Sequence, residues 1–264
     1  MNIEAATPII LAMKRRQILT VLGGLGLAGP LAAITPSGRA AAADLPEGVF
    51  FQNRGSVEGW DYSYAQKQGT ITTVDTPTYK GAHALAATQT YVNETGGYHS
   101  EVLRRGAQSV GEDRYYGQAI RLAPDWRFHD QNVTFQQFSP EDPEGPWLLM
   151  FVMGNKIQYG GRAVSGTVGS IADLRGTWIR IVVRLKLADS GQGAFEVWLN
   201  GKKTVSSTGI TLLPSTSRTI RWSSGIYCTA WRDGTPAGPS TLTVLHDQHR
   251  IASSYALAEP ANWT

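Results

Sequence analysis

Cysteine is nearly absent from this chain: Cys228 is the only one in 264 residues. A single thiol excludes an intramolecular disulfide, and it excludes zinc sites built from several thiolates. Histidine is also scarce, with five residues, and no group of them has the spacing that is typical of a metal centre. We therefore expect a thiol buried in the core, no zinc chemistry and no organic cofactor.

The chain also lacks a large excess of one charge once its N-terminus is set aside. It has 24 basic and 21 acidic residues, and residues 1–43 hold four of the basic ones and one of the acidic ones. The remainder carries 20 of each sign. Because the sequence pI of about 9.0 comes mostly from the first 43 residues, it gives no reason to expect a nucleic-acid partner.

No hydrophobic run is long and uninterrupted enough for a membrane span of about 20 residues. The apolar run at residues 21–34 contains Pro30 and several glycines, and it follows Arg15-Arg16 and precedes the small residues 40–43. A basic start, an apolar stretch and a small-residue cleavage site are the layout of an export signal. We predict a bacterial twin-arginine signal peptide over residues 1–43 rather than an anchor. The mature protein is then secreted, to the periplasm or the medium, and does not contact a membrane.

Helical periodicity is missing from residue 45 onward, and short alternating runs bounded by Gly, Pro, Asn and Asp take its place. This pattern predicts an all-β fold, a single-domain β-jelly roll built as a concanavalin-like two-sheet sandwich. We expect one domain over residues 44–264, present as a monomer. The expected strands include residues 70–74, 84–91, 114–122, 132–138, 147–153, 177–187, 193–199, 225–229 and 240–247.

One expected strand, residues 98–105, mixes apolar and polar positions. Alternation places His99, Glu101 and Leu103 on one face and Ser100 and Val102 on the other. A histidine and a glutamate two positions apart on a sheet face indicate either a polar cleft or an ordinary solvated surface. In residues 132–138 the same alternation places Thr134, Gln136 and Phe138 together.

The order of several short motifs along residues 51–247 resembles the jelly-roll polysaccharide lyases related to heparin lyase I and glucuronan lyase. The motifs are Lys80-Gly81, His99-Ser100-Glu101-Val102, Tyr115-Tyr116-Gly117, Phe135-Gln136-Gln137-Phe138, Gly176-Thr177-Trp178, Val197-Trp198-Leu199-Asn200-Gly201, Gly225-Ile226-Tyr227 and His246-Asp247. Two of them depart from the family pattern. His99 stands where such lyases often have Arg, and Gln136-Gln137-Phe138 stands where they often have Gln-Trp-His.

The resemblance implies β-elimination on a uronic-acid polymer. That reaction needs a group that neutralises the uronate carboxylate, a base for the C5 proton and an acid for the departing oxygen. We assign Gln136 to the carboxylate, His99 as base or second neutralising group, and Tyr227 as acid, or as both acid and base. The competing interpretations are a structural glutamine, an exposed strand histidine and a core tyrosine.

Supporting roles go to the neighbours of these residues in the sequence. We expect Glu101 to orient a neighbour, and Arg104 or Arg105 to offer a guanidinium for carboxylate recognition, which favours Arg105 because Arg104 points away from His99. A structural salt bridge is the simpler role for Arg104.

Three further residues are predicted to line a cleft and contact substrate. Tyr115 shares a strand face with Arg121; we expect Tyr115 to line the cleft as a sugar platform and Arg121 to contact substrate. His129 lies in a polar loop that we expect at the rim of the cleft, although a solvated loop histidine is the plain alternative.

Domains of this type often hold a structural calcium ion between the first strands and the last. By their order in the chain, Glu58, Gly81 and Asp247 match such a site. If no calcium binds there, Asp247 is a turn residue.

Two other functions fit the same architecture. A glycoside hydrolase needs two carboxylates across the scissile bond; Glu101 offers one, and the acidic residues near 141–144 lie in a proline-rich loop. A non-catalytic carbohydrate-binding module needs no base. The sequence favours a secreted lyase whose partner is an anionic, uronate-containing polysaccharide.

Overall fold

The computed structural model describes residues 45–141, 147–213, 218–232 and 234–263. The predicted signal peptide lies outside these residues. Within them, no helix is both long and apolar enough to cross a membrane.

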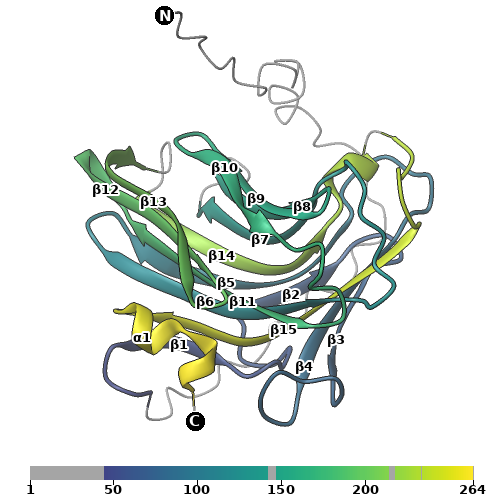
Figure 1. Ribbon diagram of the computed structural model, residues 1–264, viewed down its shortest axis with the longest axis horizontal. Coiled ribbons are helices and arrows are strands. Elements are labelled where there is room, and N and C mark those ends of the chain that lie inside the picture. Colours follow the sequence, from purple (N-terminus) through teal and green to yellow (C-terminus); the bar gives the residue numbers. More distant parts are fainter. Residues whose placement is uncertain (1–44, 142–146, 214–217, 233, 264) are drawn as a thin grey trace, which may run out of the picture. The chain divides into compact units, whose positions relative to one another are not determined.

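The fold is all-β, with two antiparallel sheets stacked as layers (Figure 1). The eight-stranded sheet has the order β13 (Lys202–Leu212), β12 (Ala188–Leu199), β11 (Trp178–Lys186), β6 (Asp113–Leu122), β15 (Thr241–Ala252), β4 (Ala84–Thr90) and β3 (Thr70–Val74), with β1 (Val49–Asn53) paired to β15. The seven-stranded sheet has the order β10 (Ser165–Ser170), β9 (Lys156–Gly161), β8 (Leu148–Met153), β7 (Val133–Pro140), β14 (Thr219–Tyr227), β5 (His99–Ser109) and β2 (Tyr62–Ala65). The jelly-roll sandwich predicted from the sequence is confirmed.

The core lies between the sheets and is rich in aromatic residues. The ring of Trp60 packs against those of Phe51 and Trp222, with centroids 4.8 and 5.4 Å apart. The rings of Tyr116 and Phe138 have centroids 4.9 Å apart. Aromatic rings bury large areas and pack edge to face, so they hold the two layers in register. Cys228 is buried as expected, and burial raises the pKa of its thiol.

A second apolar cluster covers the far side of the eight-stranded sheet. There the short helix α1 (Tyr255–Ala258) packs on Val182 and Trp198, with the rings of Trp198 and Tyr255 4.9 Å apart. This helix explains why Val182 is buried although alternation on β11 turns it away from the core.

The turn between β12 and β13 follows from its Asn-Gly pair. Asn200 and Gly201 have φ values of 51° and 88°, and these residue types adopt the left-handed region that tight hairpins require. The hairpin predicted over this stretch is confirmed.

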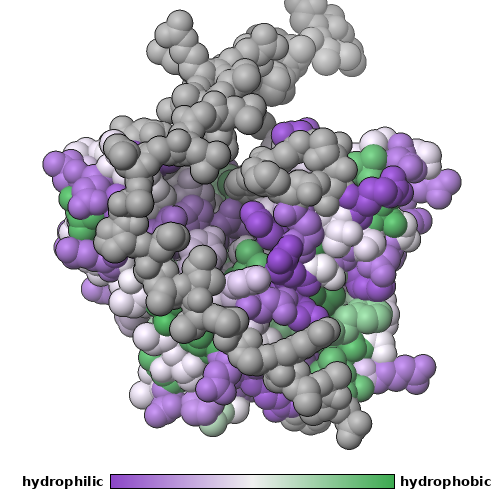
Figure 2. Space-filling model, turned by 180° about the vertical axis from the view of Figure 1, so that it is seen from behind, coloured by the Kyte–Doolittle hydropathy of each residue, from purple (hydrophilic) through white to green (hydrophobic). Residues whose placement is uncertain are grey.

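Hydrophilic residues make up much of the face seen in Figure 2, with smaller hydrophobic areas between them. Among the described residues, the large hydrophobic side chains that are exposed are those of Leu45 and Phe50. A surface with so little apolar area leaves polar contacts as the main way to recognise a ligand.

Candidate functional site

Strand β5 carries a histidine and a glutamate on the face of the seven-stranded sheet that is turned away from the other sheet. We call this outward side of the seven-stranded sheet the cleft face. Val102 is fully buried in the core, so its neighbours Glu101 and Leu103 point the other way. In the register, Tyr227 of β14 pairs with His99, and Tyr64 of β2 pairs with Glu101. Three adjacent strands therefore bring polar side chains to one place.

Glu101 is the centre of this cluster. Its side chain is 0% exposed and accepts hydrogen bonds at both oxygens. Nδ1 of His99 lies 2.7 Å from Oε2, the Tyr64 hydroxyl donates to Oε2 at 2.5 Å, and Nε2 of Gln137 donates to Oε1. A buried carboxylate is costly unless it is paired and hydrogen-bonded, and here it is both.

The electrostatics keep this carboxylate ionised. Burial by itself raises the pKa of Glu101, but the charge of His99 and the hydrogen bonds from His99, Tyr64 and Gln137 outweigh it, and the net pKa is lowered. Burial, and then the charge of Glu101, raise the pKa of Tyr64 well above its usual value. Tyr64 therefore remains a neutral donor beside an anion.

The imidazole of His99 is stacked on the ring of Tyr227. The ring centroids are 3.7 Å apart and the planes are inclined by 14°. His99 keeps 20% of its side chain exposed, and Tyr227 is 7% exposed. Because Glu101 holds Nδ1, Nε2 is the nitrogen left for a substrate.

The structure corrects the placement of Gln136. It lies between the sheets, fully buried, and its Oε1 accepts a hydrogen bond of 3.0 Å from Nε2 of Gln118. The pairing of β7 with β8 is irregular between Thr134 and Gln136. Such a bulge breaks simple alternation. The bulge turns Phe135 towards the core as well, but Gln136 and Phe138 share a side as alternation predicts, and that side is the core rather than the cleft face. Gln137 is the glutamine on the cleft face.

The polar network that contains Gln136 continues through the interior beneath β14. The Ser224 hydroxyl donates to Oε1 of Gln118 at 2.9 Å and lies 3.0 Å from Nδ1 of His246 and 2.9 Å from Nε2 of His249. Burial lowers the pKa of His246 to about 4 and that of His249 well below its usual value. Both imidazoles are therefore neutral at neutral pH.

A pocket of about 330 Å³ adjoins the cluster on the cleft face. Of the residues that line it, the sequence predicted Arg105 as a substrate contact and did not indicate the others, because the walls come from three strands that are distant in the chain. It is lined by Tyr62, Ser63, Tyr64, Leu103, Arg105 and Arg221.

Of the two arginines considered on β5, Arg105 lines this pocket. Its Nε donates to Glu141 at 3.0 Å, and this hydrogen bond raises the pKa of Arg105. Arg104 points to the opposite face and forms an ion pair with Asp61 at 3.0 Å. Strand parity predicted both orientations correctly.

Tyr115 and Arg121 do not reach the cleft face, so their expected placement is wrong. Both lie on β6, in the eight-stranded sheet, and their neighbour Tyr116 is the one in the core. Tyr115 instead packs near Trp198, with ring centroids 5.9 Å apart, and Nε of Arg121 donates to the carbonyl of Gly176 at 2.9 Å. The sequence pattern defines the faces of a strand but not the sheet that it joins.

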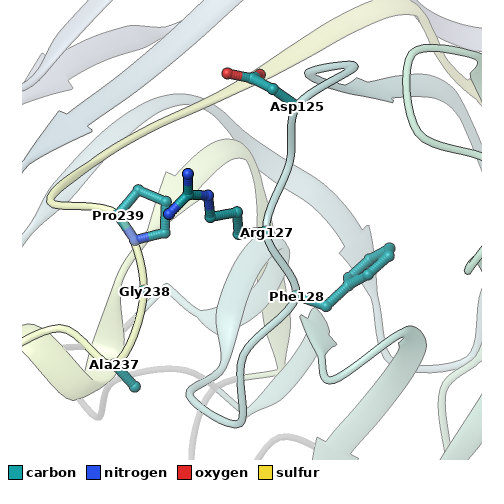
Figure 3. Close-up of a pocket in the computed structure, with 6 residues that line it drawn as sticks. All are labelled: Asp125, Arg127, Phe128, Ala237, Gly238 and Pro239. Carbon is teal, nitrogen blue, oxygen red and sulfur yellow. The ribbon is translucent and has the colours of Figure 1, made fainter.

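His129 lies beside a different pocket, of about 520 Å³, between the loops that precede β7 and follow β14. A Cβ atom on Gly238 would be 2.5 Å from its Cδ2, so the imidazole packs tightly against that loop. Burial lowers its pKa. None of its contacts within the described residues joins it to His99. In Figure 3 the Arg127 side chain extends towards Pro239, while Phe128 points away from that loop.

The residues predicted for calcium give the ion little support. Both oxygens of Asp247 accept N–H bonds, from the backbone of Tyr79 at 2.8 Å, of Lys80 at 3.1 Å and of Gln248 at 2.6 Å. Within the described residues no group of three or more His, Cys, Asp or Glu is placed to hold a metal. Asp247 lies inside β15 rather than in a turn. The side chains present fit a hydrogen-bonded structural aspartate, and calcium binding remains a prediction.

A model of the family described as polysaccharide lyase matches residues 52–250. The chain belongs to the polysaccharide lyase family. A search of curated proteins found no match. Among solved structures, this polysaccharide lyase is similar to an endo-β-1,4-glucuronan lyase from the fungus Trichoderma reesei, with 26% identity and a TM-score of 0.77 over 81% of this chain and all of that one.

A weaker match, to the cellulose-induced protein Cip1, has 17% identity and a TM-score of 0.52, and covers 72% of this chain and 88% of the other. At that identity the likeness concerns the fold alone. Family membership makes this protein a lyase that acts on polysaccharides.

Proposed function

We propose that this polysaccharide lyase is exported and cleaves a uronic-acid polymer by β-elimination, leaving an unsaturated uronate at the new end. The observation that carries the proposal is the Glu101–His99 pair at 2.7 Å with Tyr227 stacked on the imidazole. The similarity to a glucuronan lyase makes a glucuronate polymer the first substrate to test.

In the proposed reaction His99 is the base. Its Nε2 removes the proton from C5 of the uronate, the electron pair forms the C4–C5 double bond, and the C4–O bond breaks. The ionised Glu101 on Nδ1 fixes the tautomer and stabilises the imidazolium that forms, as a buried carboxylate does behind a catalytic histidine. Glu101 is thus a positioning residue.

Tyr227 is the proposed acid, and its hydroxyl protonates the departing glycosidic oxygen. Stacking against His99 holds the two proton-transfer groups on the same side of the sheet. The proton taken by His99 can then return to the tyrosinate, which restores both groups for the next turnover.

Gln137 takes the part first assigned to Gln136. One N–H of its amide is donated to Glu101, and an amide nitrogen has a second N–H to offer. A neutral donor at this position stabilises the charge that develops on the uronate carboxylate without competing for the Glu101 charge.

The geometry does not favour hydrolysis. A glycoside hydrolase uses two carboxylates that reach the sugar, whereas Glu101 is fully buried and engaged by three donors. A binding module would have no use for a buried carboxylate that orients a histidine.

The test offers glucuronan, alginate and a heparin-like chain to the purified enzyme and follows the ultraviolet absorbance of unsaturated uronate. We expect absorbance with at least one polyuronate, and a loss of about 100-fold or more in kcat for His99→Gln and for Tyr227→Phe. The controls are His83→Gln and Tyr91→Phe, which change exposed or partly exposed residues elsewhere. New reducing ends without absorbance, or full turnover by both site variants, would refute the proposal.

Export is tested separately. The full chain should leave the cytoplasm of a bacterium that has a working twin-arginine pathway, and Arg15→Lys together with Arg16→Lys should retain it inside. Export of that double variant at the normal rate would rule out the twin-arginine route.

A further inference from the structure

Arg221 brings a cation to the cleft face that the reaction described above does not use. It lies on β14, paired with Ser139 of β7, and alternation places it on the same face as Ser223 and Tyr227. Its side chain lines the pocket of about 330 Å³ that shares Tyr64 with the Glu101 cluster.

Within the described residues, this guanidinium makes no ion pair, and its Nε is buried without a hydrogen-bond partner. The other arginine of the pocket differs, because Arg105 is already bound to Glu141. Because that Nε atom is enclosed by protein, an anion in the pocket meets the terminal nitrogens of the guanidinium instead. Arg221 is therefore the cation of the pocket that is available to an anion.

Arg221 is also electrostatically close to the Glu101 cluster. Burial and the charge of Glu101 raise the pKa of Tyr64, and the positive charge of Arg221 opposes them. The guanidinium thus acts on the hydroxyl that donates to Glu101 at 2.5 Å.

The remaining walls suit a sugar. Tyr62 and Tyr64 are partly exposed and present aromatic surface, and Leu103, which pairs with Tyr62 in the register, contributes an apolar wall. A tyrosine ring offers an apolar face to the C–H side of a pyranose and a polar edge to its hydroxyls. A guanidinium beside such a surface matches a carboxylate in two-point geometry.

Resting on the proposed lyase reaction, we propose that this pocket binds the carboxylate of a second uronate of the same polymer chain, outside the cleaved linkage, through Arg221. The enzyme therefore favours polymers in which uronates follow one another, and it disfavours those in which neutral sugars alternate with uronates.

The test measures kcat and KM on glucuronan and on glucuronan whose carboxylates have been partly reduced to neutral glucose. For Arg221→Met, which keeps the aliphatic stem, we expect KM on glucuronan to rise about 10- to 100-fold while kcat stays within about threefold. Arg221→Lys should recover part of the loss. The advantage of the wild type over Arg221→Met should shrink on the reduced polymer.

Arg121→Met, on the far sheet, is the matched control. An unchanged KM in Arg221→Met, or the same ratio of wild type to variant on both polymers, would overturn the inference while leaving the lyase reaction intact. If the wild type forms no unsaturated product from any polyuronate, the proposed function fails. In that case affinity electrophoresis of wild type and Arg221→Met in glucuronan gels still decides whether the pocket binds the polymer.

Discussion

Two histidine-containing polar clusters lie on opposite sides of strand β14, and they differ in charge. On the cleft face, His99 is paired with Glu101, whose pKa is lowered despite burial. Between the sheets, His246 and His249 surround Ser224, and burial lowers the pKa of both imidazoles. Histidine thus lies in a charged, reachable cluster on one side of the strand and in a neutral, enclosed cluster on the other. Accessibility and a charged partner, rather than the presence of histidine, mark the chemical site.

The largest effect is expected from removing the charge of the cleft-face cluster. Glu101→Gln keeps the size of the side chain but loses the anion on Nδ1 of His99, and kcat should fall by about 100- to 10,000-fold. The measurement is the rate of unsaturated uronate formation, with near-ultraviolet circular dichroism to confirm folding. Glu94→Gln, an exposed carboxylate bound to Lys67, is the control. Wild-type turnover in folded Glu101→Gln would mean that His99 does not need its partner.

The enclosed cluster of His246, His249 and Ser224 should instead affect how the free energy of unfolding depends on pH. The pKa of His246 is about 4 in the folded protein and 6.5 without burial. Above pH 6.5 neither state binds the proton and the stability is fully present. As the pH falls from 6.5 towards 4, the unfolded state binds the proton first. The free energy of unfolding then decreases by about 3 kcal/mol.

Urea unfolding at pH 7 and pH 4.5 measures this loss. His246→Gln should reduce the difference and leave the part that His249 contributes, and His83→Gln, at an exposed site, should leave it unchanged. An equally steep loss in His246→Gln would show that other groups govern acid unfolding.

The smallest effect is expected on the far sheet. Arg121→Ala removes a side chain that donates to the Gly176 carbonyl, so kcat and KM on a polyuronate should change by no more than about twofold, and stability by about 1 kcal/mol. A tenfold rise in KM would show that substrate also contacts the eight-stranded sheet.

The sequence predicted features that depend on neighbouring residues, and it missed features that depend on contacts between distant strands. Alternation is a local property, and it correctly placed His99 with Glu101 and turned Arg104 away. The hairpin at Asn200 was likewise predictable from two residues. Gln136 was misplaced because alternation grouped it with Phe138 but could not say that their shared face is the core.

The partners of the site were missed for a similar reason. Tyr64 and Arg221 meet the cluster only because β2 and β14 flank β5. Tyr115 was misplaced because alternation cannot say which sheet a strand joins. A signal for Tyr64 was available in the sequence, since it alternates with Tyr62 on a short strand, but its pairing with Glu101 needed the fold.

The most direct test of the contrast between the two clusters uses the adjacent glutamines, which point to opposite sides of β7. We predict that Gln137→Ala lowers kcat of the folded enzyme by about 100-fold or more, and that it also lowers the free energy of unfolding by about 1–3 kcal/mol because the buried Glu101 carboxylate loses a donor. We predict that Gln136→Ala lowers the free energy of unfolding by about 1–3 kcal/mol and leaves kcat of the folded enzyme within about threefold. The reverse result, with turnover lost in folded Gln136→Ala and kept in Gln137→Ala, would contradict the assignment of the cleft face as the catalytic side.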